Sequence, residues 1–121
     1  MLFVDDDPPV LSIMVEKLEN LLGNQFTITS CSTGADALIS VGKTKPAVII
    51  LDILLPDING TLVCQELREN PETKSIFIIA ISGNQDSGAK AVKAGANLFY
   101  EKPLDFNTIK EKILSSVNTQ P

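Results

Sequence analysis

The sequence predicts a doubly wound α/β fold, in which five parallel strands and five helices alternate along the chain and pack as a three-layer α/β/α structure. Short apolar runs alternate with longer segments of helical periodicity from one end of the chain to the other. The runs at 47–51 and 76–81 are apolar at every position, which is typical of parallel strands that helices cover on both faces. Because crossovers between parallel strands are right-handed, the alternation favours an open, doubly wound sheet.

The first expected strand is the apolar run 2–4, and a helix follows it. This helix begins at Pro8-Pro9, since proline is tolerated in the first turn of a helix. Residues at helical spacing form its predicted apolar face, namely Val10, Met14, Leu18 and Leu21. Residues 26–31 alternate apolar side chains with Thr and Ser, which indicates a second strand at a half-exposed edge of the sheet.

A second helix, a central strand and a third helix are expected in the middle of the chain. Ser32, Thr33 and Gly34 supply capping residues for the second helix, and Pro46 prevents its continuation. The run 47–51 is the central strand. The predicted apolar positions are Ala37, Leu38 and Val41 in the second helix and Leu62, Val63 and Leu67 in the third. The third helix ends near Asn70-Pro71.

The last part of the chain is predicted to contain two strands and two helices. The strand 76–81 precedes the weakest helix, 89–94, which consists of Ala, Lys and one Val and is expected to be the most mobile element. A shorter strand lies at 97–100. A last amphipathic helix has a predicted apolar face of Phe106, Ile109, Ile113 and Val117.

The composition excludes several classes of protein. The chain contains no histidine, which removes histidine-based metal sites, a Ser-His-Asp triad and an imidazole base. A formal net charge of -5 gives no basic surface for nucleic acid, and no apolar run approaches the roughly 20 residues of a membrane span. Cys31 and Cys64 form no CxxC pair, so we expect two buried thiols in a reduced, cytoplasmic protein. The length suits one domain over residues 1–121.

Polar side chains follow four of the five predicted strands, at the edge where open α/β sheets bind their ligands. These are Asp5, Asp6 and Asp7 after the first strand, Asp52 after the third, Ser82 at the end of the fourth and Lys102 after the fifth. Clustered carboxylates repel one another, and Mg²⁺ relieves that repulsion because it prefers oxygen ligands from carboxylates and phosphates. Lys102 adds a positive charge and Ser82 a hydrogen-bond donor for a phosphoryl group. We therefore predict a magnesium-dependent phosphoryl-transfer site, with Asp7 as a helix cap or surface charge.

These residues resemble the receiver domain of two-component response regulators, over the whole chain. Residues 49–60 are similar to the family's phosphoacceptor motif, with proline four and glycine eight residues after Asp52. Residues 3–6 resemble its acidic pair, 81–83 its hydroxyl switch and 102–103 its lysine motif. The four motifs occur in the family's order. The resemblance implies a flavodoxin-like (βα)5 fold and a phosphoacceptor function.

The resemblance also implies a role for each residue of the site. Asp52 would be the nucleophile that becomes an acyl phosphate. Asp6 would bind Mg²⁺ directly and Asp5 through water, with Asp52 and the backbone carbonyl of Leu54 as further ligands. The phosphoryl group would come from a phosphohistidine on a sensor histidine kinase or a histidine phosphotransfer protein. The domain would then act as a phosphoacceptor and not as an enzyme.

An output follows from the same resemblance. Ser82 would move toward the phosphoryl group that Lys102 contacts, and Phe99, the aromatic residue three positions before Lys102, would turn inward. The face formed by the last strand and the helices on either side of it would be remodelled for an output domain outside this chain or for a second copy. Phe99 lacks a phenolic hydroxyl, so only the packing part of this switch is expected. Gly83 would leave space for the incoming group.

Leu54 occupies a position where some members of the family carry a polar residue that orients water for dephosphorylation. We hypothesise that Leu54, two residues after Asp52, disfavours that water and lengthens the phosphorylated lifetime. Asn84, on the opposite side of the site, would partly restore it.

Three alternatives from other classes remain. A haloacid-dehalogenase-like phosphatase would use Asp5 as nucleophile, but Pro9 stands where a small residue is needed and no late acidic pair follows the fourth strand. A flavodoxin-like FMN module would need a loop rich in Ser, Thr and Gly where three aspartates stand. A receiver-like adaptor that binds a partner without phosphorylation stays open, although the complete set of acidic, hydroxyl and lysine residues argues against it.

Overall fold

Five strands of the protein form one parallel sheet, in a computed structural model that describes residues 1–118. They are β1 (Leu2–Val4), β2 (Thr29–Cys31), β3 (Val48–Asp52), β4 (Phe77–Ser82) and β5 (Leu98–Glu101). The strand order is β2-β1-β3-β4-β5, so the chain first winds outward from β1 to β2 and then returns past β1 to β3. This reversal of direction confirms the predicted doubly wound topology and places β2 at an edge, as expected.

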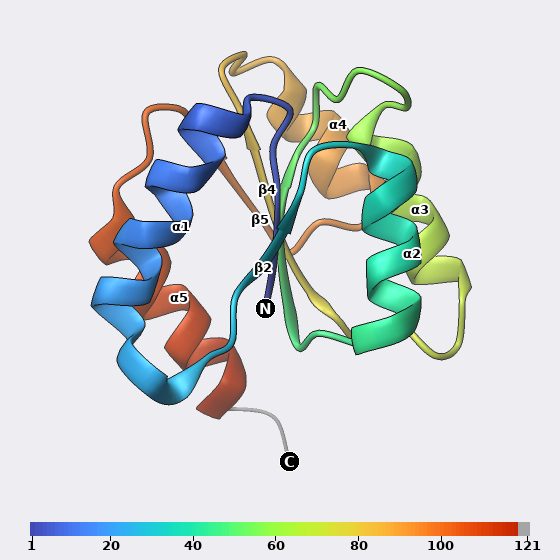
Figure 1. Ribbon diagram of the computed structural model, residues 1–121. Helices are drawn as coiled ribbons and strands as arrows, with labels where there is room; N and C mark the ends of the chain where they lie inside the picture. The colour runs from blue at the N-terminus through green and yellow to red at the C-terminus, as the bar shows by residue number, and fades with distance from the viewer. Residues whose placement is uncertain (119–121) are drawn as a thin grey trace.

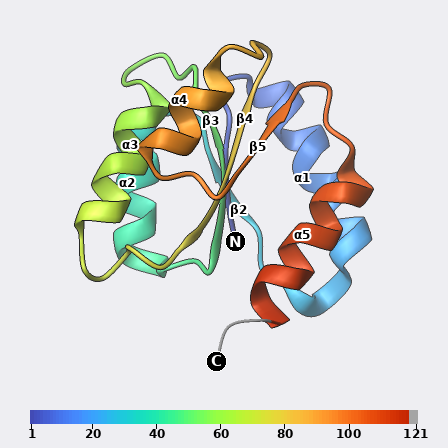
Figure 2. The same cartoon turned by 180° about the vertical axis from the view of Figure 1, so that it is seen from behind.

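Helices cover both faces of the sheet (Figure 1). They are α1 (Pro8–Leu22), α2 (Gly34–Thr44), α3 (Gly60–Glu69), α4 (Ser87–Ala94) and α5 (Phe106–Asn118), with a short 3₁₀ turn, η1 (Gly23–Gln25), after α1. Helices α1 and α5 lie against one face and α2, α3 and α4 against the other, as the view from behind also shows (Figure 2). The predicted three layers are therefore confirmed. No helix within residues 1–118 combines the length and apolar character that crossing a bilayer requires.

The core divides into two clusters because successive side chains of a strand point to opposite faces of the sheet. In β3, Ile49 and Leu51 pack on the side of α2 and α3, whereas Val48 and Ile50 pack on the side of α1 and α5. All four side chains are fully buried. Burial on both faces explains why these strands read as continuous apolar runs. Cys64 is buried as predicted, whereas Cys31 is half-buried, and burial raises the pKa of both thiols to about 11.

The second strand is shorter than the predicted range 26–31. It pairs only with β1, and the register Leu2 with Thr29 to Val4 with Cys31 uses all three residues of that strand. Phe26 and Ile28 pack against the core without joining the strand. The length of β1 therefore limits β2, which the alternation of residues 26–31 alone does not reveal.

The predicted apolar faces of three helices are wrong in part. The buried residues of α1 are Leu11, Met14, Leu18 and Leu22, whereas Val10 is 39% exposed and Leu21 only half-buried. Successive residues of a helix point about 100° apart, so the inward stripe passes through Leu11 and not Val10. Leu62 and Val117 are likewise exposed, at 49% and 37%, because Cys64 and Ser116 take the inward places on α3 and α5.

Candidate functional site

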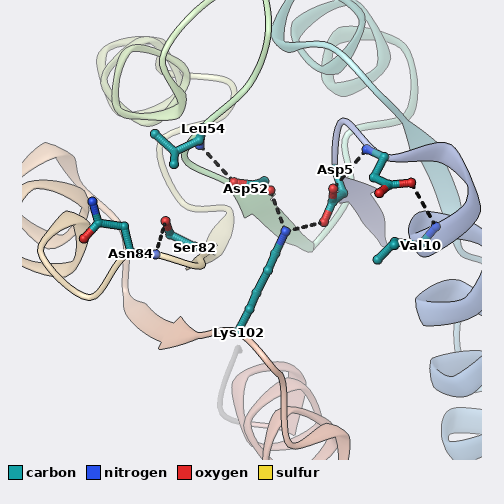
Figure 3. A network of polar contacts seen from close by, with 8 residues as sticks. Asp5, Val10, Asp52, Leu54, Ser82, Asn84 and Lys102 are labelled. Carbon is teal, nitrogen blue, oxygen red and sulfur yellow. Dashed lines mark hydrogen bonds and ion pairs between the residues drawn. The ribbon is translucent and has the colours of Figure 1, made fainter.

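Four of the parallel strands deliver polar side chains to one edge of the sheet (Figure 3). Asp52 and Ser82 are the last residues of β3 and β4, and Asp5 and Lys102 directly follow β1 and β5. The pairing of Asp52 with Ile81 and of Ser82 with Glu101 keeps the ends of these strands level. The sheet therefore brings residues as far apart in sequence as Asp5 and Lys102 into contact.

Lys102 is the centre of the charge balance at this edge. Its ammonium nitrogen lies 2.8 Å from Asp5 Oδ2 and 2.8 Å from Asp52 Oδ2, and Figure 3 shows it reaching between the two carboxylates. The backbone N–H of Lys102 donates to the carbonyl of Ser82 at 2.8 Å, and the following peptide bond to Pro103 is cis. Asp5 is 0% exposed and Asp52 4%, so the single cation compensates two buried anions.

The surroundings shift the proton affinities of two of these groups. Burial raises the pKa of the Asp52 carboxyl, although hydrogen bonds from Lys102 and from the Leu54 N–H act in the opposite direction. Burial acts to lower the pKa of the Lys102 ammonium, but its hydrogen bonds to Asp5 and Asp52 outweigh that effect and the pKa is raised. Lys102 therefore stays charged, while Asp52 carries its charge at a cost that a further cation would reduce.

Asp6 completes a cluster of three carboxylates. One oxygen each from Asp5, Asp6 and Asp52 lies within 4.8 Å of the others, and Asp6 is exposed to solvent. Hard oxygen donors with one open side suit Mg²⁺, which usually keeps several waters in its shell. The donor set therefore fits the metal that the sequence predicts. The Asp7 side chain is not part of this cluster, although the Asp7 backbone N–H donates to Asp5 Oδ1 at 3.2 Å. Its carboxylate caps α1 and accepts a hydrogen bond from the Val10 N–H at 3.4 Å, in line with its prediction.

Contacts between the two ends of the loop from β3 to α3 close this loop beside Asp52. The Leu54 N–H donates to Asp52 Oδ1 at 2.9 Å, and Leu54 pairs with Asn59 in an isolated antiparallel bridge. The Gly60 N–H donates to the carbonyl of Ile53 at 2.7 Å. A Cβ at position 60 would lie 2.7 Å from the backbone of Asp52 and Ile53, which explains the glycine eight residues after Asp52.

Ser82 and Phe99 lie on the side of the site toward α4. Ser82 is fully buried and lies on the side of Asp52 away from Asp5 (Figure 3). Its Oγ accepts a hydrogen bond from the Asn84 N–H at 3.0 Å. Phe99 is half-buried against Gly88 of α4, where a Cβ would lie 2.8 Å from the ring. A Cβ on Gly83 would meet nothing within 4 Å, so neighbouring atoms do not require a glycine there, and its role in leaving space for the phosphoryl group stays a prediction.

The family of the chain follows from comparison with known proteins. The response regulator receiver domain family matches residues 1–114. The chain belongs to this family. Receiver domains serve two-component response regulators, and accepting a phosphoryl group is the family's general function. The resemblance predicted from four short motifs is confirmed.

The receiver domain is similar in sequence to named regulators and in structure to a solved receiver domain. The probable transcriptional regulatory protein TcrX of Mycobacterium tuberculosis is 32% identical over 107 residues, which are 88% of this chain and 44% of TcrX. The probable transcriptional regulator ycf27 of Porphyra purpurea is 29% identical over 115 residues, 95% of this chain and 46% of that protein. The chain thus spans less than half the length of these relatives. The signal receiver domain of a DNA-binding response regulator from Colwellia psychrerythraea superposes with a TM-score of 0.89 at 28% identity, covering 98% of this chain and 97% of that one.

Sequence reasoning missed two residues that fasten loops, Asp57 in the loop after β3 and Arg68 at the opposite edge of the sheet, where β4 and β5 begin. The Asp57 carboxylate accepts hydrogen bonds from the N–H groups of Gly34 and Ala35 at 2.8 and 2.9 Å. The Arg68 guanidinium donates to the carbonyls of Gly95, Lys74 and Ile76 and to Asn97 Oδ1. Most of these partners lie more than 20 residues away in sequence, so no local pattern could have indicated them.

An open cavity of about 520 Å³ lies between α3 and α4, and the two residues that follow Asp52 in sequence line one end of it. Its lining includes Ile53, Leu54, Asn59, Asn84 and Ser87. The Leu54 side chain is 52% exposed, so an apolar group stands at the solvent-facing side of the acidic cluster.

Proposed function

We propose that this receiver domain accepts a phosphoryl group on Asp52 in a reaction that requires Mg²⁺. The observation that carries the proposal is the shared ion pair of Lys102 with Asp5 and Asp52, both at 2.8 Å, at the carboxyl edge of the sheet. A buried carboxylate beside a lysine and two further carboxylates lowers the stability of the fold, so stability alone does not explain it. The arrangement suits phosphoryl transfer. The general function of the family supports the same assignment.

Asp5, Asp6, Asp52 and the backbone carbonyl of Leu54 are the groups that would hold the metal. When bound, Mg²⁺ would supply positive charge to the phosphoryl oxygens and to the carboxylate cluster. The receiver domain of the sensor histidine kinase PA1611 from Pseudomonas aeruginosa, which shares this fold with a TM-score of 0.83 at 22% identity, has a magnesium ion coordinated in its active site cleft.

Asp52 would act as the nucleophile. One of its carboxylate oxygens forms a bond to phosphorus while the bond from phosphorus to the donor nitrogen breaks, and the electron pair of that bond returns to the donor imidazole. The transition state is loose and in line, so the protein contributes position and charge compensation. Lys102, already 2.8 Å from Asp52 Oδ2, is placed to compensate the phosphoryl charge. Membership of the family supports a phosphohistidine on a histidine kinase or a histidine phosphotransfer protein as the donor, and a chain without histidine is consistent with a donor histidine on another protein.

The product of this reaction would change the face made by α4, β5 and α5. Ser82, fully buried at the end of β4, would turn its hydroxyl to the phosphoryl group. Phe99 would repack beneath α4, a helix of only eight residues whose Gly88 contacts the ring. The remodelled face would then bind an output region outside residues 1–121 or a second copy of the domain.

The phosphatase alternative finds no support in the geometry. Its nucleophile would be Asp5, whose carboxylate is 0% exposed and bound to Lys102 at 2.8 Å. Asp52 shares the ion pair with Lys102 and is only slightly more exposed, at 4%. It is nevertheless the better nucleophile, because the two residues that follow it, Ile53 and Leu54, line the open cavity, whereas the neighbours of Asp5 in sequence do not.

The direct test is phosphorylation by a small donor. After incubation with acetyl phosphate and Mg²⁺, intact mass spectrometry should detect one base-labile phosphoryl group, which Asp52→Asn and metal chelation both abolish. Asp7→Asn is the matched control, because Asp7 lies beside the cluster in sequence but caps α1, and asparagine also caps helices. A phosphoryl group that survives Asp52→Asn, or that forms equally without metal, contradicts the proposal.

A further inference from the structure

We infer that Asp57 is a positioning residue for this site, because it fastens the loop between β3 and α3 to the first turn of α2. The loop carries Leu54, whose backbone is proposed to contact the metal, so the inference rests on the proposed function and extends it. Asp57 lies outside the acidic cluster, and the resemblance of residues 49–60 to the phosphoacceptor motif gives it no role of its own.

The contact is specific on both sides. Asp57 Oδ1 accepts from the Gly34 N–H at 2.8 Å and Oδ2 accepts from the Ala35 N–H at 2.9 Å, so both carboxylate oxygens are used. The first N–H groups of a helix have no carbonyl partner within the helix, and the partial positive charge there favours an anion. Hydrogen bonds from Ala35 and Gly34 lower the pKa of the Asp57 carboxyl, which therefore stays ionised.

Packing beside Asp57 is equally close. A Cβ on Gly34 would run into the side chain of Ile58, so the start of α2 can approach the loop only because residue 34 is glycine. Ile58 is half-buried and packs against the core cluster of α2 and α3. Asp57 and Ile58 together make a two-point contact, one polar and one apolar, between the loop and α2.

This contact is transmitted to Asp52 through a short, closed path. Asp57 lies at the tip of the loop, and the bridge between Leu54 and Asn59 closes the loop below that tip. Leu54 in turn donates its N–H to Asp52 Oδ1 at 2.9 Å. Leu54, Pro56 and Asp57 are all exposed, so solvent alone would leave this stretch free to move. The Asp57 hydrogen bonds fix the position of the loop tip relative to α2, and they thereby hold the backbone of Leu54 in place.

The expected consequence is a weaker metal site when the contact is removed. Residues that orient metal ligands typically change affinity by about 10- to 100-fold, and Asp57 acts through the backbone, so we expect about 10-fold. Asp57→Ala should raise the dissociation constant for Mg²⁺, measured by calorimetry or by NMR titration of backbone amides, by that factor. The phosphorylation rate at saturating Mg²⁺ should stay close to that of the parent, because Asp57 does not touch the reacting groups.

Two further variants separate this role from general stability and from charge. Thr33→Ala removes the other cap of α2, the bond from Asp36 N–H to Thr33 Oγ1 at 3.1 Å, without touching the loop. It should lower the melting temperature at least as much as Asp57→Ala but leave the Mg²⁺ affinity unchanged. Asp57→Asn removes the charge and keeps one acceptor, so its Mg²⁺ affinity should lie between those of the parent and Asp57→Ala.

Each alternative result overturns the inference in a recognisable way. If Asp57→Ala binds Mg²⁺ as the parent does, the loop does not depend on Asp57, and the proposed function stands without it. If Thr33→Ala weakens Mg²⁺ binding equally, the effect belongs to the stability of α2. If Asp57→Asn binds Mg²⁺ as tightly as the parent does, the two-oxygen contact on which the inference rests is not required. A parent domain that binds no Mg²⁺ overturns the proposed function itself, and this inference with it.

Discussion

The side chains at the edge of the sheet are arranged around an excess of negative charge. Lys102 binds Asp5 and Asp52, both nearly inaccessible to solvent, while Asp6 contributes a third carboxylate from the exposed side. One ammonium cannot balance three carboxylates. Without a bound metal ion, the domain therefore holds Asp52 in an unfavourable charged state. Binding of a metal ion, or bond formation to a phosphoryl group, would relieve that cost.

The pH dependence of stability should reveal this strain. Because burial raises the pKa of Asp52 above 3.8, the folded state binds the proton more tightly than the unfolded state, and ionisation of Asp52 opposes folding. Without Mg²⁺, Asp52→Asn should therefore raise the melting temperature near pH 7. This gain should shrink as the pH falls through the raised pKa and disappear below 3.8, where the parent carboxyl is protonated in both states. Thermal unfolding of both proteins across that pH range checks this, and a gain independent of pH contradicts it.

Leu54 offers a second prediction at the scale of one residue. Its exposed side chain lines the cavity beside Asp52, where a polar group could hold a water molecule. Leu54→Asn should shorten the half-life of the acyl phosphate several-fold, measured as loss of the phosphoryl group after the donor is removed. Leu62→Asn is the matched control, because Leu62 is 49% exposed on α3 and does not line the cavity. An unchanged half-life in Leu54→Asn rejects the hypothesis that Leu54 protects the phosphoryl group.

At the scale of the element, the loop between β3 and α3 decides the shape of the site. Gly60 allows the loop to close, since its backbone passes directly over Asp52 and Ile53. A Cβ on Gly42, in the last turn of α2, would meet nothing within 4 Å, so this position has no such reason to be glycine. Of these two glycines, the structure therefore requires only Gly60.

Alanine at these two positions should have effects of opposite sign. Gly60→Ala should destabilise the domain by about 1–3 kcal/mol, because the new Cβ meets backbone that cannot move aside. Gly42→Ala should stabilise it by about 0.5–1 kcal/mol, because alanine favours a helix interior. Urea unfolding of the two variants checks both signs. A neutral Gly60→Ala contradicts the close approach that the loop requires.

Within residues 1–118, sequence patterns identified the five strands and the five α-helices, but neither the 3₁₀ turn η1 nor all of the buried faces. Fully apolar runs located β3 and β4 because burial on both faces leaves no polar position. In α1 the order Val10-Leu11 offered two apolar residues, and only the packing of the helix against the sheet selects Leu11. Helix orientation is a tertiary property, which a local pattern determines only within about one residue.

At the scale of the whole molecule, the site exists because the carboxyl ends of four parallel strands meet. This rule allowed Asp5, Asp52, Ser82 and Lys102 to be predicted as neighbours, and the structure brings Asp5 and Asp52 into contact through Lys102. The same rule could not find Asp57 or Arg68, whose partners lie on other helices and loops. Long-range hydrogen bonds to backbone groups leave no signature in composition or spacing.

In TcrX and ycf27 the region similar to this chain is part of a larger protein, since the chain spans less than half the length of each. A domain of this kind can pass a signal only if phosphorylation changes a surface. We propose that Asp52, with Mg²⁺ held by its acidic neighbours, receives the phosphoryl group that causes this change.

A crystal structure of the domain soaked with Mg²⁺ and beryllofluoride tests that claim most directly, because beryllofluoride imitates a phosphoryl group on a carboxylate. The account predicts beryllofluoride on Asp52, contacted by Lys102, and Mg²⁺ bound by Asp6 and Asp52. Electron density showing neither group, with Lys102 still bridging Asp5 and Asp52, would contradict it.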